Sequence, residues 1–156
     1  MVKIRRFRVS DTKEVVSLIR NTFSKYNREG TEEGIKNYLH LYSIENNNIE
    51  RLKTSFLKYP IFFVALDGEK IVGIIRGNKE KLVNLFVLGS YHKQGIGRKL
   101  VEKFEKQCWA DGSEKIRMRA SIFAIPFYEK MGYKKTTGVR KFRGLKIQPM
   151  QKHSIR

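Results

Sequence analysis

The longest regular hydrophobic pattern in the chain runs from Leu82 to Trp109. It opens with an apolar stretch, Leu82–Leu88, whose length and β-forming residues predict a buried strand. A polar loop over residues 89–94 follows, and Asp111-Gly112 supplies a stop signal after the pattern. Apolar residues after the loop recur at every fourth position, as on the buried face of a helix: Ile96, Leu100, Phe104 and Cys108. The segment is therefore predicted to form a strand, a glycine-containing turn and a helix.

Shorter patterns predict the remaining elements. Apolar stretches predict strands at Val2–Val9, Ile61–Leu66, Ile71–Arg76, Lys115–Ala120, Tyr133–Lys135 and Leu145–Met150. Helical spacing predicts helices over 11–23, 31–42, 49–57 and 124–131. Asp11 is expected to cap the first of these helices, with Glu14 at the capping-box position. The polar patch at residues 45–48 separates the second helix from the third. A chain of 156 residues is expected to form one domain, residues 1–156.

The turn before the helix at Ile96 has the composition of a phosphate-binding site. The first N–H groups of a helix have no partners within it, and the helix dipole places partial positive charge there. Gly95 and Gly97 would let a phosphate approach the backbone with no Cβ in the way. Lys93, Arg98 and Lys99 add formal positive charge around the same point. The sequence therefore predicts a pyrophosphate cradle at this turn.

Two stretches of the chain resemble motifs of the GNAT family of N-acetyltransferases. Residues 92–97, His-Lys-Gln-Gly-Ile-Gly, resemble motif A, which reads Gln/Arg-x-x-Gly-x-Gly/Ala after a strand; His92 departs from it. Residues 124–133, Ala-Ile-Pro-Phe-Tyr-Glu-Lys-Met-Gly-Tyr, resemble motif B, which follows the next strand. The two motifs occur in the family's order and spacing, and the resemblance covers nearly the whole chain. It implies a single-domain α/β acyl-CoA N-acyltransferase fold, with a mixed, mostly antiparallel sheet flanked by helices.

The resemblance also implies acetyl-CoA as cosubstrate and direct transfer of its acetyl group to an amine. Tyr128 of motif B would act as general acid and protonate the departing thiolate; its alternative role is to pack the helix against the sheet. The strand before motif A would offer main-chain groups to the pantetheine arm and an N–H to the oxyanion. Ser121 replaces an asparagine that contacts pantetheine in many relatives. The implied cofactor-binding residues are Leu85, Phe86, Val87, Leu88, His92, Lys93, Gln94, Gly95, Ile96, Gly97, Arg98 and Ser121.

The sequence does not identify a general base or the acceptor. Some relatives carry a glutamate where this chain has Val83, so deprotonation of the amine is expected through waters or in solution. Asn84 either orients a water or is a polar strand residue, and His92 is expected to be a solvated loop residue. The acceptor is expected to be a small-molecule or peptide amine.

The net charge of +18 and the pI near 10.2 favour anionic partners. No acidic residue follows Glu129, whereas nine basic residues do: Lys130, Lys134, Lys135, Arg140, Lys141, Arg143, Lys146, Lys152 and Arg156. A nucleic-acid-binding protein on the same scaffold is therefore an alternative, although few aromatic residues accompany these charges. Polycationic acceptors are disfavoured by the overall field, unless the acidic residues within 29–50 counter it locally.

The remaining sequence features concern the cellular compartment, membranes, metals and oligomeric state. The single cysteine, Cys108, falls on the apolar helix face and is expected to be a buried hydrophobe in a reduced, cytoplasmic protein. The sequence contains no apolar run of membrane-spanning length and no metal-ligand spacing, so neither membrane nor metal is expected. A monomer or homodimer is expected. Val83 and Ser121 leave open a third alternative, a CoA-binding protein without catalysis.

Overall fold

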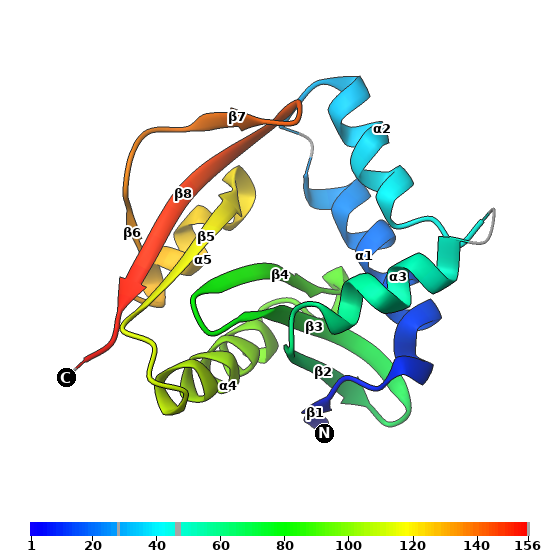
Figure 1. Cartoon of the computed structure of the whole chain (residues 1–156), viewed down its shortest axis with the longest axis horizontal. Helices are drawn as coiled ribbons and strands as arrows, with labels where there is room; N and C mark the ends of the chain where they lie inside the picture. Colours follow the sequence, from blue (N-terminus) through cyan, green and yellow to red (C-terminus); the bar gives the residue numbers. More distant parts are fainter. Residues whose placement is uncertain (28, 46–47, 156) are drawn as a thin grey trace.

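A mixed sheet organises the protein (Figure 1). The computed structural model describes residues 1–27, 29–45 and 48–155. Asn46 and Asn47 of the polar patch, Arg156 of the basic C-terminal region, and Arg28 lie outside the described residues. The strand order is β1-β2-β3-β4-β5-β8-β6, with β7 paired to β8, and only β4 and β5 are parallel within the described chain. The strands are β1 Val2–Arg6, β2 Ile61–Asp67, β3 Lys70–Asn78, β4 Lys81–Val87, β5 Lys115–Ser121, β6 Lys134–Lys135, β7 Arg140–Phe142 and β8 Leu145–His153.

Helices cover both faces of the sheet and form two hydrophobic cores. The α-helices are α1 Thr12–Tyr26, α2 Glu32–Leu41, α3 Asn48–Leu57, α4 Ile96–Ala110 and α5 Ile125–Lys130. On one face, α4 and α5 pack against the sheet through residues such as Phe104 and Tyr128. On the other face, α1 and α3 supply Val15, Ile19 and Phe56 to a second core, with Tyr38 of α2 at its margin. The predicted mixed, mostly antiparallel α/β fold is confirmed.

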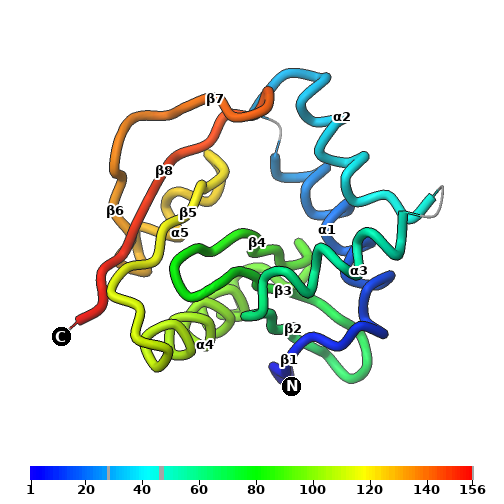
Figure 2. The backbone as a smooth tube through the Cα atoms, viewed as in Figure 1, coloured from blue at the N-terminus to red at the C-terminus, as the bar shows by residue number. Residues whose placement is uncertain are grey.

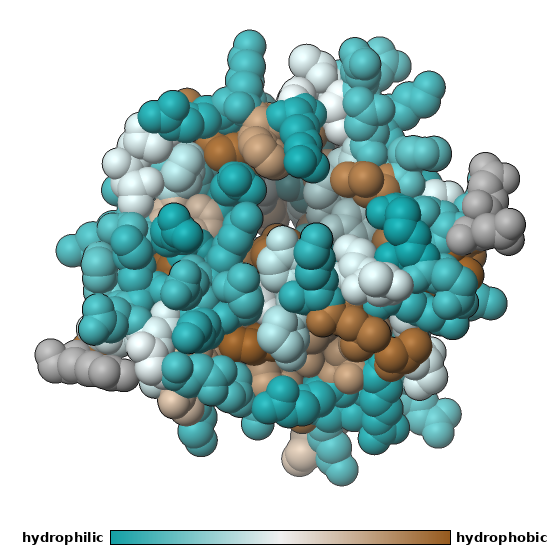
Figure 3. Space-filling model, in the orientation of Figure 1, coloured by the Kyte–Doolittle hydropathy of each residue, from teal (hydrophilic) through white to brown (hydrophobic). Residues whose placement is uncertain are grey.

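The strands β4 and β5 separate soon after they meet. Their parallel pairing is confined to Lys81 opposite Arg117 and Leu82 opposite Met118. Beyond that point β4 stays paired with β3, whereas β5 pairs along its whole length with β8. The two strands therefore diverge, and β5 and β8 lean away from β4 (Figure 1). Figure 3 shows the surface hollowed between β4 and the β7–β8 hairpin.

The chain start differs from the sequence prediction. The first strand ends at Arg6 instead of Val9, because the Asp11 carboxylate accepts hydrogen bonds from the backbone N–H of Arg8 (2.8 Å) and from the guanidinium of Arg5 (2.8 and 3.0 Å). These bonds fold Val9–Asp11 into a turn of 3-10 helix. The predicted capping box at α1 is therefore wrong: Asp11 occupies the N-cap position with no side-chain cap, and Glu14 accepts from the N–H of Ile71.

The C-terminal hairpin of β7 and β8 reaches across to the start of α2, as the tube in Figure 2 shows. The strand β7 was missed by the sequence analysis, which treated this basic segment as a connection. Its turn uses two residues with positive φ, Arg143 (50°) and Gly144 (79°). The Gly144 carbonyl accepts a 2.7 Å bond from the N–H of Thr31, and the backbone N–H of Lys146 donates to the backbone carbonyl of Glu29. These bonds join the hairpin to the other side of the gap.

Gly34 is required for this close approach. An added Cβ at Gly34 would lie 2.6 Å from the Gly144 oxygen, inside van der Waals contact. A glycine-to-alanine change inside a helix ordinarily stabilises it by about 1 kcal/mol. Because of this clash, we expect Gly34→Ala to destabilise the protein instead. The free energy of unfolding should fall by about 1–2 kcal/mol, measured by urea denaturation. Gly138→Ala is the control, because nothing lies within 4 Å of its Cβ position; equal effects of the two changes would contradict this assignment.

Cys108 is fully buried in the α4 core, which confirms its prediction as a buried hydrophobe. Burial raises the pKa of its thiol to about 12. An unfolded chain releases this proton near the ordinary pKa of about 8.5, so the folded state loses stability as the pH rises from there towards 12.

We expect the free energy of unfolding of the wild type to fall more steeply with pH than that of Cys108→Ala. The difference in slope between pH 8.5 and 10 should reach up to about 1.4 kcal/mol per pH unit, measured by urea denaturation. Comparing slopes cancels the constant cost of the cavity that alanine leaves. Parallel slopes in the two proteins would show that the folded thiol ionises normally.

Candidate functional site

A cavity of about 1260 Å³ occupies the gap between β4 and β5 and opens to both faces of the sheet. Its lining on one face comes from α4 and α5, including Gly97, Phe127 and Tyr128. Its lining on the other face comes from α1 and α2, including Phe23 and Tyr38. A ligand on one face can therefore meet a ligand on the other through the gap in the sheet.

The start of α4 forms one wall of the cavity. Gly95, the N-cap residue, has φ of 78°, in the left-handed region that glycine adopts without strain, and the space around its Cβ position is open. An added Cβ at Gly97 would lie 3.3 Å from the Phe127 ring, so glycine lets α4 and α5 approach each other. The N–H groups of Ile96 and Gly97, in the first turn of α4, lack helical partners. This open backbone fits the predicted pyrophosphate cradle, and the cradle itself stays a prediction.

Not all of the polar and basic side chains predicted near this wall line the cavity. Lys93 lies on the cavity with φ of 61°, in the turn before the helix. Arg98 also lines the cavity, and its Nε donates a 2.9 Å bond to Glu102 on the next helical turn. Gln94 is exposed, lies outside the cavity lining and donates to the carbonyl of Ser90. Ser121, at the end of β5, does line the cavity.

Only part of the predicted β4 segment presents backbone groups to the gap. The N–H of Leu88 donates 2.9 Å to Val72 of β3. Because successive backbone groups of a strand point to opposite edges, Leu85 and Val87 direct theirs towards the gap and Phe86 directs its own towards β3. Leu88 is outside the cavity lining. The sequence resemblance could not separate these four residues, because strand register decides between them.

His92 is held in place rather than solvated, which corrects the sequence analysis. A carbonyl oxygen can only accept, so the His92 Nε2–H donates the 2.7 Å bond to Val87. The imidazole ring also lies 4.9 Å from the Tyr26 ring, which in turn lies 4.9 Å from Phe123. These three rings join the end of α1, the motif A loop and the turn before α5. His92, which replaces the glutamine or arginine of motif A, thus holds the motif A loop against the Val87 carbonyl at the gap.

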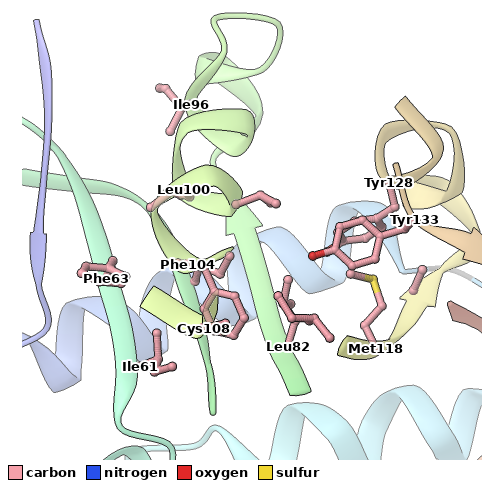
Figure 4. Packing of buried hydrophobic residues seen from close by; sticks show 14 of the residues in the cluster. Ile61, Phe63, Leu82, Ile96, Leu100, Phe104, Cys108, Met118, Tyr128 and Tyr133 are labelled. Atoms are coloured by element: carbon pink, nitrogen blue, oxygen red, sulfur yellow. The ribbon is translucent and has the colours of Figure 1, made fainter. Parts of the chain in front are cut away.

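Tyr128 stands at the base of the gap with an unpaired hydroxyl. The side chain is 5% exposed and packs with Tyr133 beside Met118 and across from Leu82 (Figure 4). Within the described chain, its hydroxyl has no hydrogen-bond partner, while no fully enclosed side-chain oxygen or nitrogen lacks one. The hydroxyl therefore faces the cavity. Desolvation raises the pKa of Tyr128, so the phenol keeps its proton through neutral pH.

A buried polar cluster fixes the end of α5. The hydroxyl of Tyr133 donates 2.8 Å to Glu105 of α4, and Lys152 of β8 donates 3.0 Å to the same carboxylate and 2.8 Å to the Met131 carbonyl. Burial and the Glu105 carboxylate raise the pKa of Tyr133, which stays a neutral donor. The cluster joins three elements around Tyr128 and holds its helix against the sheet.

The α2 side of the cavity contains a donor chain that the sequence analysis missed. Arg76 of β3 is 3% exposed, and its Nε donates 3.0 Å to the Asn84 amide oxygen. The Asn84 amide nitrogen donates 3.3 Å to the hydroxyl of Tyr38. Desolvation lowers the pKa of Arg76 and raises that of Tyr38. Asn84 is thus a structural link; its only sequence signal was a polar residue within an apolar strand.

Comparison with known proteins identifies the family. The acetyltransferase (GNAT) domain matches residues 24–154. The chain belongs to the GNAT family. This membership confirms the family predicted from the sequence.

Individual relatives agree with that assignment. An uncharacterised N-acetyltransferase of Bacillus subtilis (strain 168), YjcF, is 35% identical over 75 residues, which is 46% of this chain and about half (54%) of that relative. A GCN5-related N-acetyltransferase from Rhodopseudomonas palustris has a TM-score of 0.81 at 16% identity, over 97% of this chain and 95% of that one. PaiA N-acetyltransferase from Thermoplasma acidophilum, solved with coenzyme A, has a TM-score of 0.71 at 22% identity over 99% of both chains. At these identities the two structures support the GNAT fold alone.

No helix within residues 1–27, 29–45 and 48–155 is long and apolar enough to cross a bilayer. No group of three or more histidine, cysteine or acidic residues there is arranged to hold a metal ion.

The cradle can be tested with two isosteric substitutions. Asparagine and aspartate both tolerate the left-handed conformation of Gly95, and they differ by one negative charge. We expect Gly95→Asp to bind acetyl-CoA at least about tenfold more weakly than Gly95→Asn in titration calorimetry, because its carboxylate would face phosphate. The difference should shrink as salt is added. Equal dissociation constants for the two variants would place the phosphates elsewhere.

Proposed function

We propose that the protein transfers the acetyl group of acetyl-CoA to a primary amine by direct attack, with Tyr128 as general acid. The observation that carries the proposal is the unpaired hydroxyl of Tyr128, which faces a cavity open to both faces of the sheet. The α4 face would hold the cosubstrate, with its pyrophosphate at Gly95–Gly97 and its pantetheine arm along β4. The PaiA N-acetyltransferase of Thermoplasma acidophilum, solved with coenzyme A, supports coenzyme A as the kind of ligand for this fold.

The acceptor would approach from the α1 and α2 face. Its neutral nitrogen attacks the thioester carbonyl carbon, and a free N–H of β4, at Leu85 or Val87, stabilises the oxyanion. Collapse of the intermediate breaks the carbon–sulfur bond, and the sulfur takes the bonding electron pair and then the proton of Tyr128. The nitrogen loses its extra proton to water, which also returns a proton to the phenolate. All atoms and charges balance without a covalent enzyme intermediate.

The described cavity lining offers little choice of general base. Glu33 is its only carboxylate, and His40 and His92 are its imidazoles. His92 donates its Nε2 proton to Val87, so that nitrogen cannot accept a proton. The proposal keeps deprotonation of the acceptor through waters or in solution, as the sequence suggested.

Tyr128→Phe tests the proposed acid. We expect kcat to fall by about a hundredfold, the scale of general acid catalysis, while the dissociation constant of acetyl-CoA stays unchanged. Tyr91→Phe is a matched control, because Tyr91 also lines the cavity but its hydroxyl donates 2.6 Å to Asp67. The measurements are steady-state release of CoA with a panel of amines and calorimetry with acetyl-CoA.

Two results would count against this role. Equal kcat values for Tyr128→Phe and Tyr91→Phe would remove Tyr128 from the chemistry. A parallel loss of acetyl-CoA binding in Tyr128→Phe would assign the tyrosine to packing. Acetyl-CoA binding without turnover of any amine would favour the non-catalytic alternative.

A further inference from the structure

The acceptor side of the cavity has its own charge pattern, distinct from the phosphate cradle. Met118 and Ala120 of β5 are buried on the α4 and α5 face, so Arg119 between them points to the opposite face, where α1 and α2 lie. Arg143, in the turn of the β7–β8 hairpin next to Phe142, also lines the cavity. The acceptor opening thus carries two cationic side chains, one from β5 and one from the hairpin turn.

These two cations have no acidic partner. The Arg119 guanidinium lies 4.1 Å from the centroid of the Phe142 ring, and that of Arg143 lies 5.0 Å from it. Neither forms an ion pair with a carboxylate in the described part of the chain. Both guanidinium groups thus contact one aromatic ring at the cavity and have no carboxylate partner. A carboxylate or phosphate that reached them would accept charge-assisted hydrogen bonds from their N–H groups.

A buried cation on β3 lies behind the cavity lining. Arg76 is a buried cation with no carboxylate partner in the described residues, held instead by Asn84 and by the rings of Phe56 and Tyr59. Arg76 is outside the cavity lining, but its hydrogen bond to Asn84 and the bond from Asn84 to Tyr38 connect it to two residues that line the cavity. The aromatic lining there includes Phe23, Tyr26, Tyr38, Tyr42 and Phe142.

Acidic groups do not offset these charges. Of the glutamates between residues 29 and 50, which would have to counter the positive field for a polycationic acceptor, only Glu33 lines the cavity. A second ammonium group on the acceptor would therefore meet more cations than carboxylates, and a negatively charged group would meet unpaired guanidinium donors.

We infer that the acceptor is a small aromatic or apolar amine that carries a negatively charged group, a carboxylate or a phosphate, bound by Arg119 and Arg143. This inference rests on the proposed acetyl transfer and names its substrate class. The anion would lie at the Phe142 edge of the cavity, the apolar body would pack among the aromatic residues of α1 and α2, and the amine would reach the gap. Arg119 and Arg143 would then select the acceptor without touching the thioester.

A matched series of amines tests this selection. Para-(aminoethyl)benzoate and para-(aminoethyl)benzamide share a skeleton and differ by one negative charge; para-(aminoethyl)phenyl phosphate gives the phosphate arm, and para-(aminomethyl)phenethylamine is dicationic. We expect the wild type to prefer the benzoate or the phosphate over the benzamide by about tenfold in kcat/KM, as two partly exposed charge pairs allow. The dication should be the poorest acceptor, and added salt should reduce the preference.

Variants test whether Arg119 and Arg143 cause the preference for anionic amines. Arg119→Gln combined with Arg143→Asn removes both charges, and asparagine tolerates the positive φ of position 143. We expect this double variant to lose the preference for the anionic amine while it keeps the benzamide rate and the acetyl-CoA dissociation constant. Arg117→Gln is the control, because Arg117 is an exposed arginine on the same strand but lies outside the cavity lining; it should keep the preference.

The outcomes separate this inference from the proposed function. Equal kcat/KM values for the benzoate, benzamide and dication in the wild type would overturn the acceptor class and leave acetyl transfer intact. Weaker acetyl-CoA binding by the double variant would assign these arginines to the cosubstrate and would also overturn it. Failure of the wild type to acetylate any amine while it binds acetyl-CoA would overturn the proposed function and the inference together.

Discussion

The separation of β4 from β5 is the constraint on which the rest of this structure depends. Two strands that share one sheet ordinarily satisfy each other's backbone groups along their length. Here the parallel pairing stops after two residue pairs, and each strand is supported by its other neighbour, β3 or β8. The sheet can therefore hold an opening at its centre without losing its integrity. The unsatisfied edge of β4 is then available to a ligand that carries amide groups, as pantetheine does.

The elements around this opening keep it at a defined width. On the α4 and α5 face, the Glu105 carboxylate joins Tyr133 and Lys152, so that α5 stays attached to both the helix α4 and the strand β8. On the opposite face, the hairpin turn at Gly144 is bonded to the start of α2. The gap is thus bridged by hydrogen bonds at both faces, where strand pairing would otherwise close it.

Local sequence patterns predicted most of this architecture, because most elements are defined by their own periodicity. The alternation in Lys115–Ala120 gives the burial pattern of β5 directly, and the apolar spacing of Ile96 to Cys108 gives α4. The strand β7 was missed because its three residues have no periodicity of their own and owe their conformation to pairing with β8. At the site, the glycine turn and Tyr128 could be named from motifs. The bond between His92 and Val87 and the chain from Arg76 to Tyr38 could not, because they depend on contacts between distant segments.

The burial of Cys108 has a consequence for the proposed acetyl transfer. A thiolate near acetyl-CoA would compete with the amine by thiol–thioester exchange and would carry the acetyl group itself. The only cysteine of the chain sits on the helix whose first turn borders the cavity, yet its sulfur is completely enclosed, and its raised pKa keeps it protonated. Helix α4 therefore contains a thiol that would not compete with the acceptor amine for the acetyl group.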